Sequence, residues 1–137
     1  MFQTSPLIKK MLIICIGNTC RSILFHSIIH SFSNKKFLNY DFYSCGVSVE
    51  SSFVSSNTSL VLINNNIDII KFRPQPITDF FDVYFDDIII LDNTISLPSQ
   101  IQFKNFFYFN IDDPFDKDLQ EYQKTFDTLF HLILSFK

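Results

Sequence analysis

The feature that most constrains the fold is a short apolar run followed at once by a turn and a helix. Residues 11–14 are all apolar, which is typical of a strand buried on both faces of a parallel sheet. The next eight residues, 15–22, contain a Gly-Asn pair that favours a sharp turn. Apolar residues at helical spacing follow, with Ser and His on the opposite face: Leu24, Phe25, Ile28, Ile29 and Phe32. The pattern predicts a strand, a loop and a helix in direct succession.

The rest of the chain repeats this alternation. Further strands are predicted at residues 40–45, 87–91 and 103–109, and further helices at 55–66, 78–85 and 119–136. Strands separated by helices give an α/β fold, here a single domain with a four-stranded parallel sheet flanked by helices. We assign this domain to residues 11–137 and interpret residues 1–10 as an N-terminal extension. The first helix is expected to end at residues 34–36.

Composition excludes several classes of protein. The chain has 137 residues and a formal net charge of −3, and no stripe of Lys and Arg favours binding of nucleic acid. Arg21 interrupts the longest nearly uncharged stretch, so neither a membrane span nor a membrane partner is expected. No secretory signal is recognised. The three cysteines are an odd number, with two of them five residues apart, which favours a reduced, cytoplasmic protein over a disulfide framework. Nothing in the sequence indicates an oligomeric state.

The loop carries the candidate chemistry. A strand–loop–helix junction directs several backbone N–H groups at one point, with the positive end of the helix dipole behind them. Such a field binds a phosphate-like dianion and stabilises a thiolate at Cys15. The guanidinium of Arg21 can bind two phosphate oxygens at once, and Ser22 can donate a hydrogen bond to the sulfur. Asn18, which tolerates a positive φ, is expected to fix the shape of the loop, and Gly17 to permit its sharp turn.

The phosphate-binding residues predicted from this loop are Ile16, Gly17, Asn18, Thr19, Cys20, Arg21 and Ser22. The competing interpretation is a buried cysteine beside the start of a helix, with Arg21 at the surface. The strand before the loop and the helix after it favour the anion site.

Residues 13–22, Ile-Ile-Cys-Ile-Gly-Asn-Thr-Cys-Arg-Ser, resemble the active-site loop of the low-molecular-weight protein-tyrosine phosphatase family, whose pattern is strand-Cys-x-Gly-Asn-x-Cys-Arg-Ser. A weaker likeness covers most of residues 11–137, with matches at 43–46, 67–68, 73–78, 91–92 and 113–114. The resemblance implies a phosphotyrosine phosphatase I-like fold and a cysteine-dependent phosphomonoester hydrolase, a protein-tyrosine phosphatase that forms a thiophosphoryl-enzyme intermediate. The expected substrate is a phosphotyrosine protein or a small aryl phosphate. No cofactor or metal is expected, because the loop supplies the positive charge itself.

The resemblance also assigns Asp113 as the general acid, which later activates water, with Asp112 as the reserve candidate. From the residues alone, Asp112-Asp113-Pro114 reads equally well as a plain turn. In the family, a partner such as Cys20 can form a reversible disulfide with the nucleophile. A small packed side chain is the alternative for Cys20, and Cys45 is interpreted as structural. His26 and His30 are interpreted as polar-face histidines rather than metal ligands.

Five positions depart from the family pattern, among them Cys45, which stands where Ala is usual. Ile23 replaces the usual Pro, Glu50 stands where an aromatic wall is common, and Phe115 and Asp116 replace two tyrosines. Glu50 and Phe115 are expected to form the rim of the substrate site. Glu50 and Asp116 would oppose an acidic phosphopeptide.

Two alternative functions follow from these departures. An arsenate reductase of the same fold is disfavoured, because no cysteine follows Cys45 to carry a disulfide relay. A non-catalytic phosphate- or phosphoprotein-binding relative would retain the loop and lose turnover.

Overall fold

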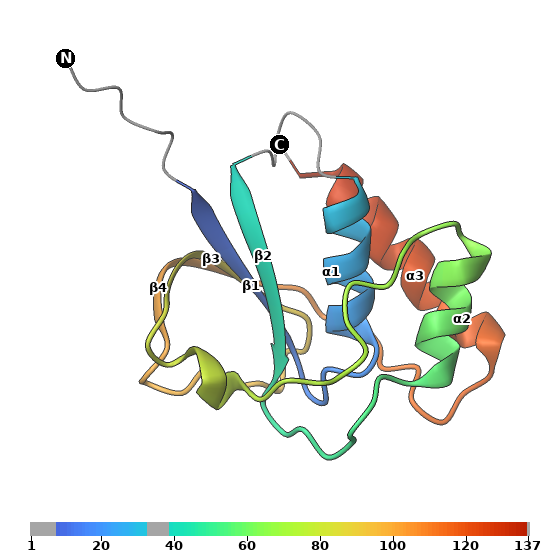
Figure 1. The fold of residues 1–137 in the computed structure, drawn as a ribbon, viewed down its shortest axis with the longest axis horizontal. Helices are drawn as coiled ribbons and strands as arrows, with labels where there is room; N and C mark the ends of the chain where they lie inside the picture. Colours follow the sequence, from blue (N-terminus) through green and yellow to red (C-terminus); the bar gives the residue numbers. More distant parts are fainter. Residues whose placement is uncertain (1–7, 33–38, 137) are drawn as a thin grey trace.

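The computed structural model describes residues 8–32 and 39–136, and its strands form one parallel sheet (Figure 1). The four strands run in the spatial order β2-β1-β3-β4. They are β1 (Lys9–Cys15), β2 (Tyr40–Gly46), β3 (Tyr84–Ile90) and β4 (Gln102–Tyr108). The single-domain α/β architecture with a four-stranded parallel sheet is therefore confirmed.

The register brings the carboxyl ends of the central strands together. Cys15, the last residue of β1, pairs with Gly46, the last residue of β2. Ile14 pairs with Ile90 at the end of β3, and the N–H of Leu91 donates to the carbonyl of Ile14 at 2.9 Å. Loops that leave these strands must therefore meet at one edge of the sheet, where ligands bind in open α/β sheets.

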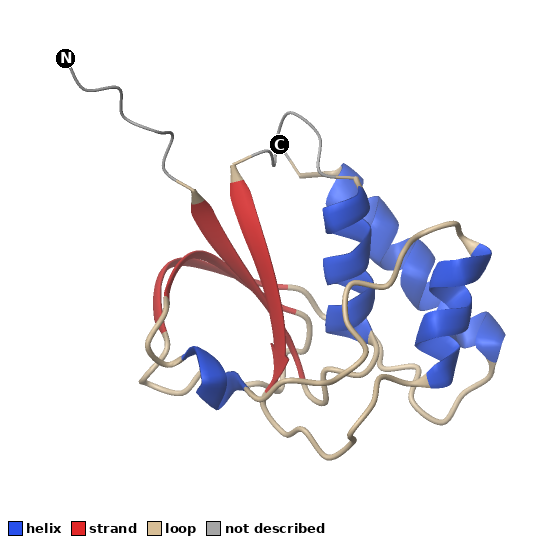
Figure 2. Ribbon diagram, in the orientation of Figure 1, coloured by secondary structure: helices blue, strands red, loops and turns tan. Residues whose placement is uncertain are grey.

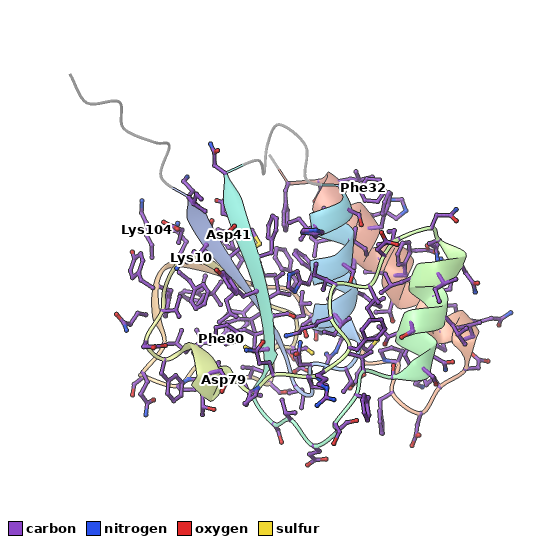
Figure 3. All side chains as sticks on the ribbon, viewed as in Figure 1. Lys10, Phe32, Asp41, Asp79, Phe80 and Lys104 are labelled. Atoms are coloured by element: carbon purple, nitrogen blue, oxygen red, sulfur yellow. The ribbon has the colours of Figure 1, made fainter. Side chains whose placement is uncertain are left out.

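The helices cover one face of the sheet, and the 3-10 turn η1 lies on the other (Figure 2). The helices are α1 (Arg21–Ser31), α2 (Ser56–Asn64) and α3 (Leu119–Leu134). The 3-10 turn, η1 (Ile77–Phe80), carries Phe80 beside Tyr43 and Phe85, with ring centroids 5.9 Å from each. Asp79 and Phe80 lie on this side in Figure 3. Because successive side chains of a strand point to opposite faces of the sheet, Met11, Ile13 and Cys15 of β1 pack in one apolar core. Leu12 and Ile14 of β1 pack in a second core on the other face.

Helix α1 has no solvent-exposed polar face along most of its length, contrary to the prediction. Every residue from Arg21 to Ile29 is buried, because α1 contacts β1, β2, α2 and α3. His26 is only 6% exposed, and its Nδ1 lies 2.9 Å from the Ser44 hydroxyl on β2. The interpretation of His26 as a polar-face histidine was wrong, whereas His30 is exposed. Ile23 does not displace the start of the helix, which begins at Arg21.

Two predicted boundaries were also wrong. The helix expected at 78–85 is only the four-residue turn η1, and β3 begins at Tyr84, because Phe85 is drawn into the sheet and its aromatic cluster. Strand β1 begins at Lys9, inside the segment interpreted as an extension. The N–H of Lys9 donates to the carbonyl of Asn39 at 2.7 Å. Residues 1–7 and the helix end predicted at 34–36 lie outside the described residues.

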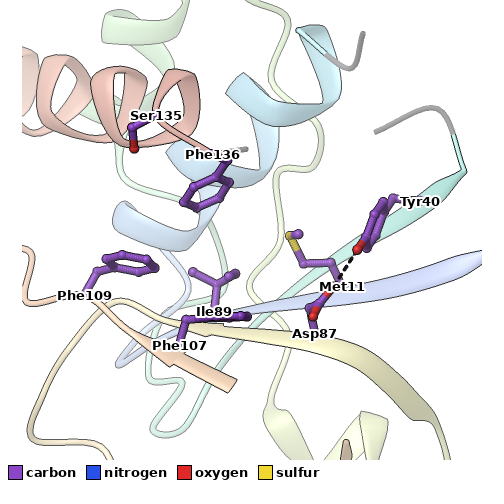
Figure 4. Close-up of a pocket in the computed structure, with 8 residues that line it drawn as sticks. All are labelled: Met11, Tyr40, Asp87, Ile89, Phe107, Phe109, Ser135 and Phe136. Carbon is purple, nitrogen blue, oxygen red and sulfur yellow. Dashed lines mark hydrogen bonds between the residues drawn. The ribbon is translucent and has the colours of Figure 1, made fainter. Parts of the chain in front are cut away.

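The far edge of the sheet is aromatic. Phe106, Phe107 and Tyr108 of β4 are exposed. A cavity of about 480 Å³ lies between the sheet and the end of α3, where the Tyr40 hydroxyl donates to Asp87 at 2.6 Å (Figure 4).

In the part of the chain that the structure describes, no helix is long and apolar enough to cross a membrane.

Candidate active site

Cys15 lies buried where β1 passes into the loop of residues 15–22. Its Sγ lies 2.9 Å from the Ser22 hydroxyl, and the Asn18 N–H donates to it at 3.3 Å. The Asn18 N–H and the Ser22 hydroxyl therefore both face the sulfur from within the loop. The loop therefore presents Cys15 as expected from its place between strand and helix.

Asn18 rather than Gly17 provides the unusual backbone conformation of the loop. Asn18 has a φ of 54°, and neither glycine has a positive φ. Its side chain is fully buried, with Nδ2 donating to the Ser22 hydroxyl at 2.7 Å and Oδ1 accepting from the Gln75 N–H at 2.9 Å. The expectation for Asn18 is confirmed, whereas a Cβ at Gly17 would meet only Thr19, at 3.7 Å.

Gly46 is the glycine that the site requires for close approach. A Cβ there would lie 2.6 Å from the Ile16 carbonyl oxygen and 2.9 Å from the Asn18 nitrogen. Both neighbours are backbone atoms, so they could not move aside without deforming the loop. The end of β2 therefore packs against the backbone of the loop at a distance that only glycine permits.

The carbonyl groups of the loop are bonded to the surrounding chain. Those of Cys15 and Ile16 accept from the N–H groups of Val47 and Ser48, at 3.2 and 2.8 Å. The Thr19 carbonyl accepts from the N–H of Ser55 and from the hydroxyl of Thr58 on α2. These bonds fix the peptide planes of the loop, and no side chain among the described residues caps the start of α1.

Arg21 is 3% exposed, which overturns the interpretation of a surface arginine. Its Nη1 donates to Asp92 and to the Ile111 carbonyl, both at 2.8 Å, and to the Leu91 carbonyl at 3.3 Å. Its Nη2 lies 3.5 Å from Asp113. The guanidinium is thus held in one orientation beside the loop.

Asp92, which follows the strand predicted at 87–91, is a functional residue whose role the sequence analysis did not assign. Burial raises the pKa of its carboxyl, but hydrogen bonds from Thr94 and Arg21 outweigh burial and hold the pKa below its usual value. Asp92 remains a carboxylate at neutral pH and anchors Arg21. Its place directly after the carboxyl end of a buried strand was the available signal.

Asp113 lies at the mouth of the site with its side chain 47% exposed. One carboxylate oxygen accepts from the Phe115 N–H at 3.1 Å, and the other faces Arg21. The turn lies just after the predicted segment, at Phe115 and Asp116, and the Phe115 N–H holds the Asp113 side chain beside Arg21. Asp112 is exposed, and Asp116 has a φ of 63°.

A groove of about 230 Å³ opens over the loop and joins it to the predicted rim. Its walls are Ile16, Gly17, Thr19, Cys20, Ser48, Glu50, Ser51, Asp113, Phe115 and Tyr122. The structure therefore brings both rim residues, Glu50 and Phe115, together with the loop and Asp113. Tyr122 of α3 also lines the groove, and the sequence analysis did not identify it as part of the site.

The remaining thiols are buried. Burial raises the pKa of Cys20 and of Cys45, and both are free. Cys45 packs in the core beneath the sheet, as its structural interpretation predicted. A reversible disulfide between Cys20 and Cys15 remains a prediction.

Comparison with known families gives a match over nearly the whole chain. The model of the family described as "Low molecular weight phosphotyrosine protein phosphatase" matches residues 10–134. No curated protein matches the sequence significantly.

Solved structures share the fold. A low molecular weight protein tyrosine phosphatase from T. tengcongensis is 26% identical, with a TM-score of 0.79 over 91% of this chain and 95% of that chain. An arsenate reductase in its reduced state is 24% identical, with a TM-score of 0.74 over 92% and 94% of the two chains. The YwlE arginine phosphatase from Geobacillus stearothermophilus is 22% identical, with a TM-score of 0.74 over 91% and 88%.

Proposed function

The chain belongs to the low molecular weight phosphotyrosine protein phosphatase family, and from this premise we propose that it is a cysteine-dependent phosphomonoester hydrolase that acts through a thiophosphoryl-enzyme intermediate. The observation that carries the proposal is the surrounding of Cys15. Its sulfur accepts from Asn18 and lies beside Ser22, and Arg21 is fixed next to the same loop.

The phosphate is held by the loop itself. Surrounding groups bind the carbonyls of Cys15, Ile16 and Thr19, and the N–H of Asn18 donates to the sulfur. The other N–H groups of the loop, between Ile16 and Ser22, would bind phosphate oxygens. Arg21 adds its guanidinium, which Asp92 orients through Nη1 alone. These donors would stabilise the charge that develops on phosphorus in both transition states.

The first step is an in-line displacement. The Cys15 thiolate attacks phosphorus and forms the S–P bond as the P–O bond to the leaving group breaks. Asp113, protonated at this stage, gives its proton to the leaving oxygen. The position of Asp113 in the wall of the groove supports this role.

The second step releases phosphate. Asp113, now a carboxylate, takes a proton from a water molecule, whose oxygen attacks phosphorus and breaks the S–P bond. Cys15 leaves as a thiolate, which the hydroxyl of Ser22 stabilises at 2.9 Å. The cycle returns the enzyme to its starting protonation state without a redox step. A reducing compartment keeps Cys15 competent, and for this reason we place the protein in the cytoplasm.

An aryl phosphate is the first candidate substrate. Phe115 is 66% exposed at the rim and can stack on a phenyl ring, with Tyr122 on another wall of the groove. This arrangement supports phosphotyrosine in a protein, or a small aryl phosphate.

A phosphorylated arginine is the second candidate, because the rim is acidic. Glu50 and Asp113 both line the groove, and none of the described residues in its walls is Lys or Arg. A substrate with a guanidino leaving group would be attracted by the Glu50 carboxylate, whereas an acidic peptide would be repelled. Asp113 would then protonate nitrogen instead of oxygen. The arginine phosphatase among the solved relatives shares this fold.

The chemistry is tested with para-nitrophenyl phosphate between pH 4.5 and 7.5, with reductant and without metal. The native protein should hydrolyse it, vanadate should block the reaction, and Cys15→Ser should abolish it. Turnover that persists in Cys15→Ser would contradict the proposal. Vanadate binding without any turnover would identify the non-catalytic binder. Arsenate reduction with a thiol would identify the reductase.

The substrate is tested by comparing kcat/KM for phosphotyrosine and for phosphoarginine in peptides of the same sequence. The two rates separate the candidates, because the peptides differ only in the group that enters the groove.

A further inference from the structure

Lys71 is a partly buried lysine in the segment between α2 and η1, and the proposed chemistry does not use it. Its Nζ donates to the carbonyl of Ser44 on β2 at 2.6 Å and to the side-chain oxygen of Gln75 at 3.3 Å. An ammonium with two protein acceptors is fixed in place rather than solvated as a mobile surface charge.

Both acceptors of Lys71 lie next to groups that support the catalytic loop. The backbone N–H of Gln75 donates to Asn18 at 2.9 Å, and the Gln75 carbonyl accepts from Gly46 at 2.9 Å. Ser44 lies two residues before Gly46 in β2. Lys71 therefore joins the two backbone segments that press against the loop.

The path from Gln75 continues to the sulfur. Asn18 donates to the Ser22 hydroxyl at 2.7 Å, and this hydroxyl lies 2.9 Å from the Sγ of Cys15. A chain of named contacts thus runs from the ammonium of Lys71 to Cys15 through Gln75, Asn18 and Ser22. Such a chain restricts the position of each member.

The charge of Lys71 acts in the same direction as these contacts. Burial lowers its pKa to about 8, while Cys45, Cys15 and Asp79 raise it, so the amine is mostly protonated at the acidic and neutral pH of the proposed reaction. The charge of Lys71 also acts on His26 of α1, whose pKa burial and Lys71 lower to about 3. His26 is therefore neutral there, and Lys71 supplies positive charge behind the loop.

We propose that Lys71 is a positioning residue for the catalytic loop: it ties Ser44 to Gln75, fixes Asn18 and Ser22 against Cys15, and stabilises the Cys15 thiolate with its positive charge. The inference rests on the proposed function, since it takes Cys15 as the nucleophile. Lys71 acts through the loop rather than on the substrate, because its ammonium is bonded to Ser44 and Gln75 on the β2 side of the loop.

The test compares Lys71→Met, which keeps a side chain of similar length without the charge, with Lys71→Arg, which keeps the charge. Lys71→Gln removes the charge and keeps a donor. Lys104→Met is the control, because Lys104 is exposed on β4 at the edge of the sheet (Figure 3). Circular dichroism verifies that each variant is folded.

The first readout is the rate at which iodoacetamide alkylates Cys15 at pH 6, with the product located by mass spectrometry. All three cysteines are buried, so burial alone does not separate them. Only the thiolate reacts, and the pKa values of Cys20 and Cys45 are raised, so the mass spectrum must assign the product to Cys15 itself. Lys71→Met should slow the reaction about threefold to tenfold, by loss of a nearby positive charge. Lys71→Arg should restore most of the rate, and Lys104→Met should not change it.

The second readout is turnover of para-nitrophenyl phosphate. In Lys71→Met, kcat should fall about tenfold with KM changed less than about twofold, since the residue acts through the loop. Unchanged alkylation in folded Lys71→Met or Lys71→Gln would overturn the inference, as would an equal effect of Lys104→Met. If the native protein has no turnover, the proposed function fails while the alkylation rates still decide the role of Lys71.

Discussion

The catalytic loop and the rim of the groove differ sharply in how the protein holds them. In the loop, Asn18, Arg21 and Ser22 are buried, and each forms hydrogen bonds to groups from other segments or to the nucleophile. At the rim, Glu50 and Phe115 are exposed and lie on connecting segments outside any helix or strand.

The difference separates two parts of the function. A loop whose polar side chains are buried and hydrogen-bonded tolerates little change, so its chemistry is set by the fold. Exposed rim residues can be replaced at small cost in stability, which allows one chemistry to serve different substrates. The family match and the unusual rim are therefore compatible.

Replacement of Arg21 is the strongest way to break the loop. Arg21→Ala should lower kcat/KM by about 10³-fold, because it removes the charged donor to the transition state and leaves Asp92 without its partner. Steady-state kinetics with para-nitrophenyl phosphate measures the loss. Arg73→Ala, at an exposed position, is the matched control, and Cys20→Ala should cost far less at neutral pH with reductant. Equal rates for Arg21→Ala and Cys20→Ala would contradict the role of the clamp.

The two glycines test the support beneath the loop. Gly46→Ala should lower the free energy of unfolding by about 2–3 kcal/mol and reduce kcat, because its Cβ would meet backbone atoms at 2.6 and 2.9 Å. Gly17→Ala should be tolerated in stability, since its Cβ meets only the Thr19 side chain, at 3.7 Å. Urea titration of both variants measures the contrast. A Gly46→Ala protein as stable as Gly17→Ala would remove the close-approach argument.

The sequence predicted the strand–loop–helix junction because its signals are local: an apolar run, a Gly-Asn turn and helical spacing. It did not predict that Arg21 would be anchored by Asp92, since a contact across 71 residues depends on which strands pair. The same reason applies to Tyr122 in the groove and to Gly46 beneath the loop. The helix predicted at 78–85 was wrong for a different reason: burial of Phe85 in the sheet overrode local helical signals.

Burial of His26 in α1 makes the stability of the protein depend on pH. Burial lowers the pKa of His26 from 6.5 to about 3, so the unfolded chain binds a proton over a range in which the folded protein does not. The stability that His26 contributes is complete above pH 6.5 and is lost as the pH falls toward 3, with a slope of up to about 1.4 kcal/mol per pH unit.

Urea unfolding at several pH values measures this slope. His26→Gln should flatten it, whereas His30→Gln, at the exposed end of α1, should leave it unchanged. A slope that persists in His26→Gln would show that other groups, such as carboxylates, account for the acid sensitivity.

Glu50 gives the smallest expected effect and sharpens the account of the rim. Glu50→Gln should lower kcat/KM for phosphoarginine peptides and raise it for acidic phosphotyrosine peptides, each by about twofold to fivefold, because an exposed charge is screened by solvent. The stability of the protein should not change. Asp41→Asn is the control, with the same loss of one negative charge at the opposite end of β2. If both variants shift the two substrates alike, net charge rather than the rim sets the preference.

The most direct test of the central claim is to trap phosphate on Cys15. Asp113→Asn retains the loop but cannot activate water, and para-nitrophenolate leaves readily without an acid, so the intermediate should accumulate. Rapid acid quench and peptide mass spectrometry should then find phosphate on the peptide that contains Cys15, and none in the Cys15→Ser protein. Hydrolysis by the native enzyme with no phosphate on Cys15 in the trapped variant, or phosphate on another residue, would contradict the proposed mechanism.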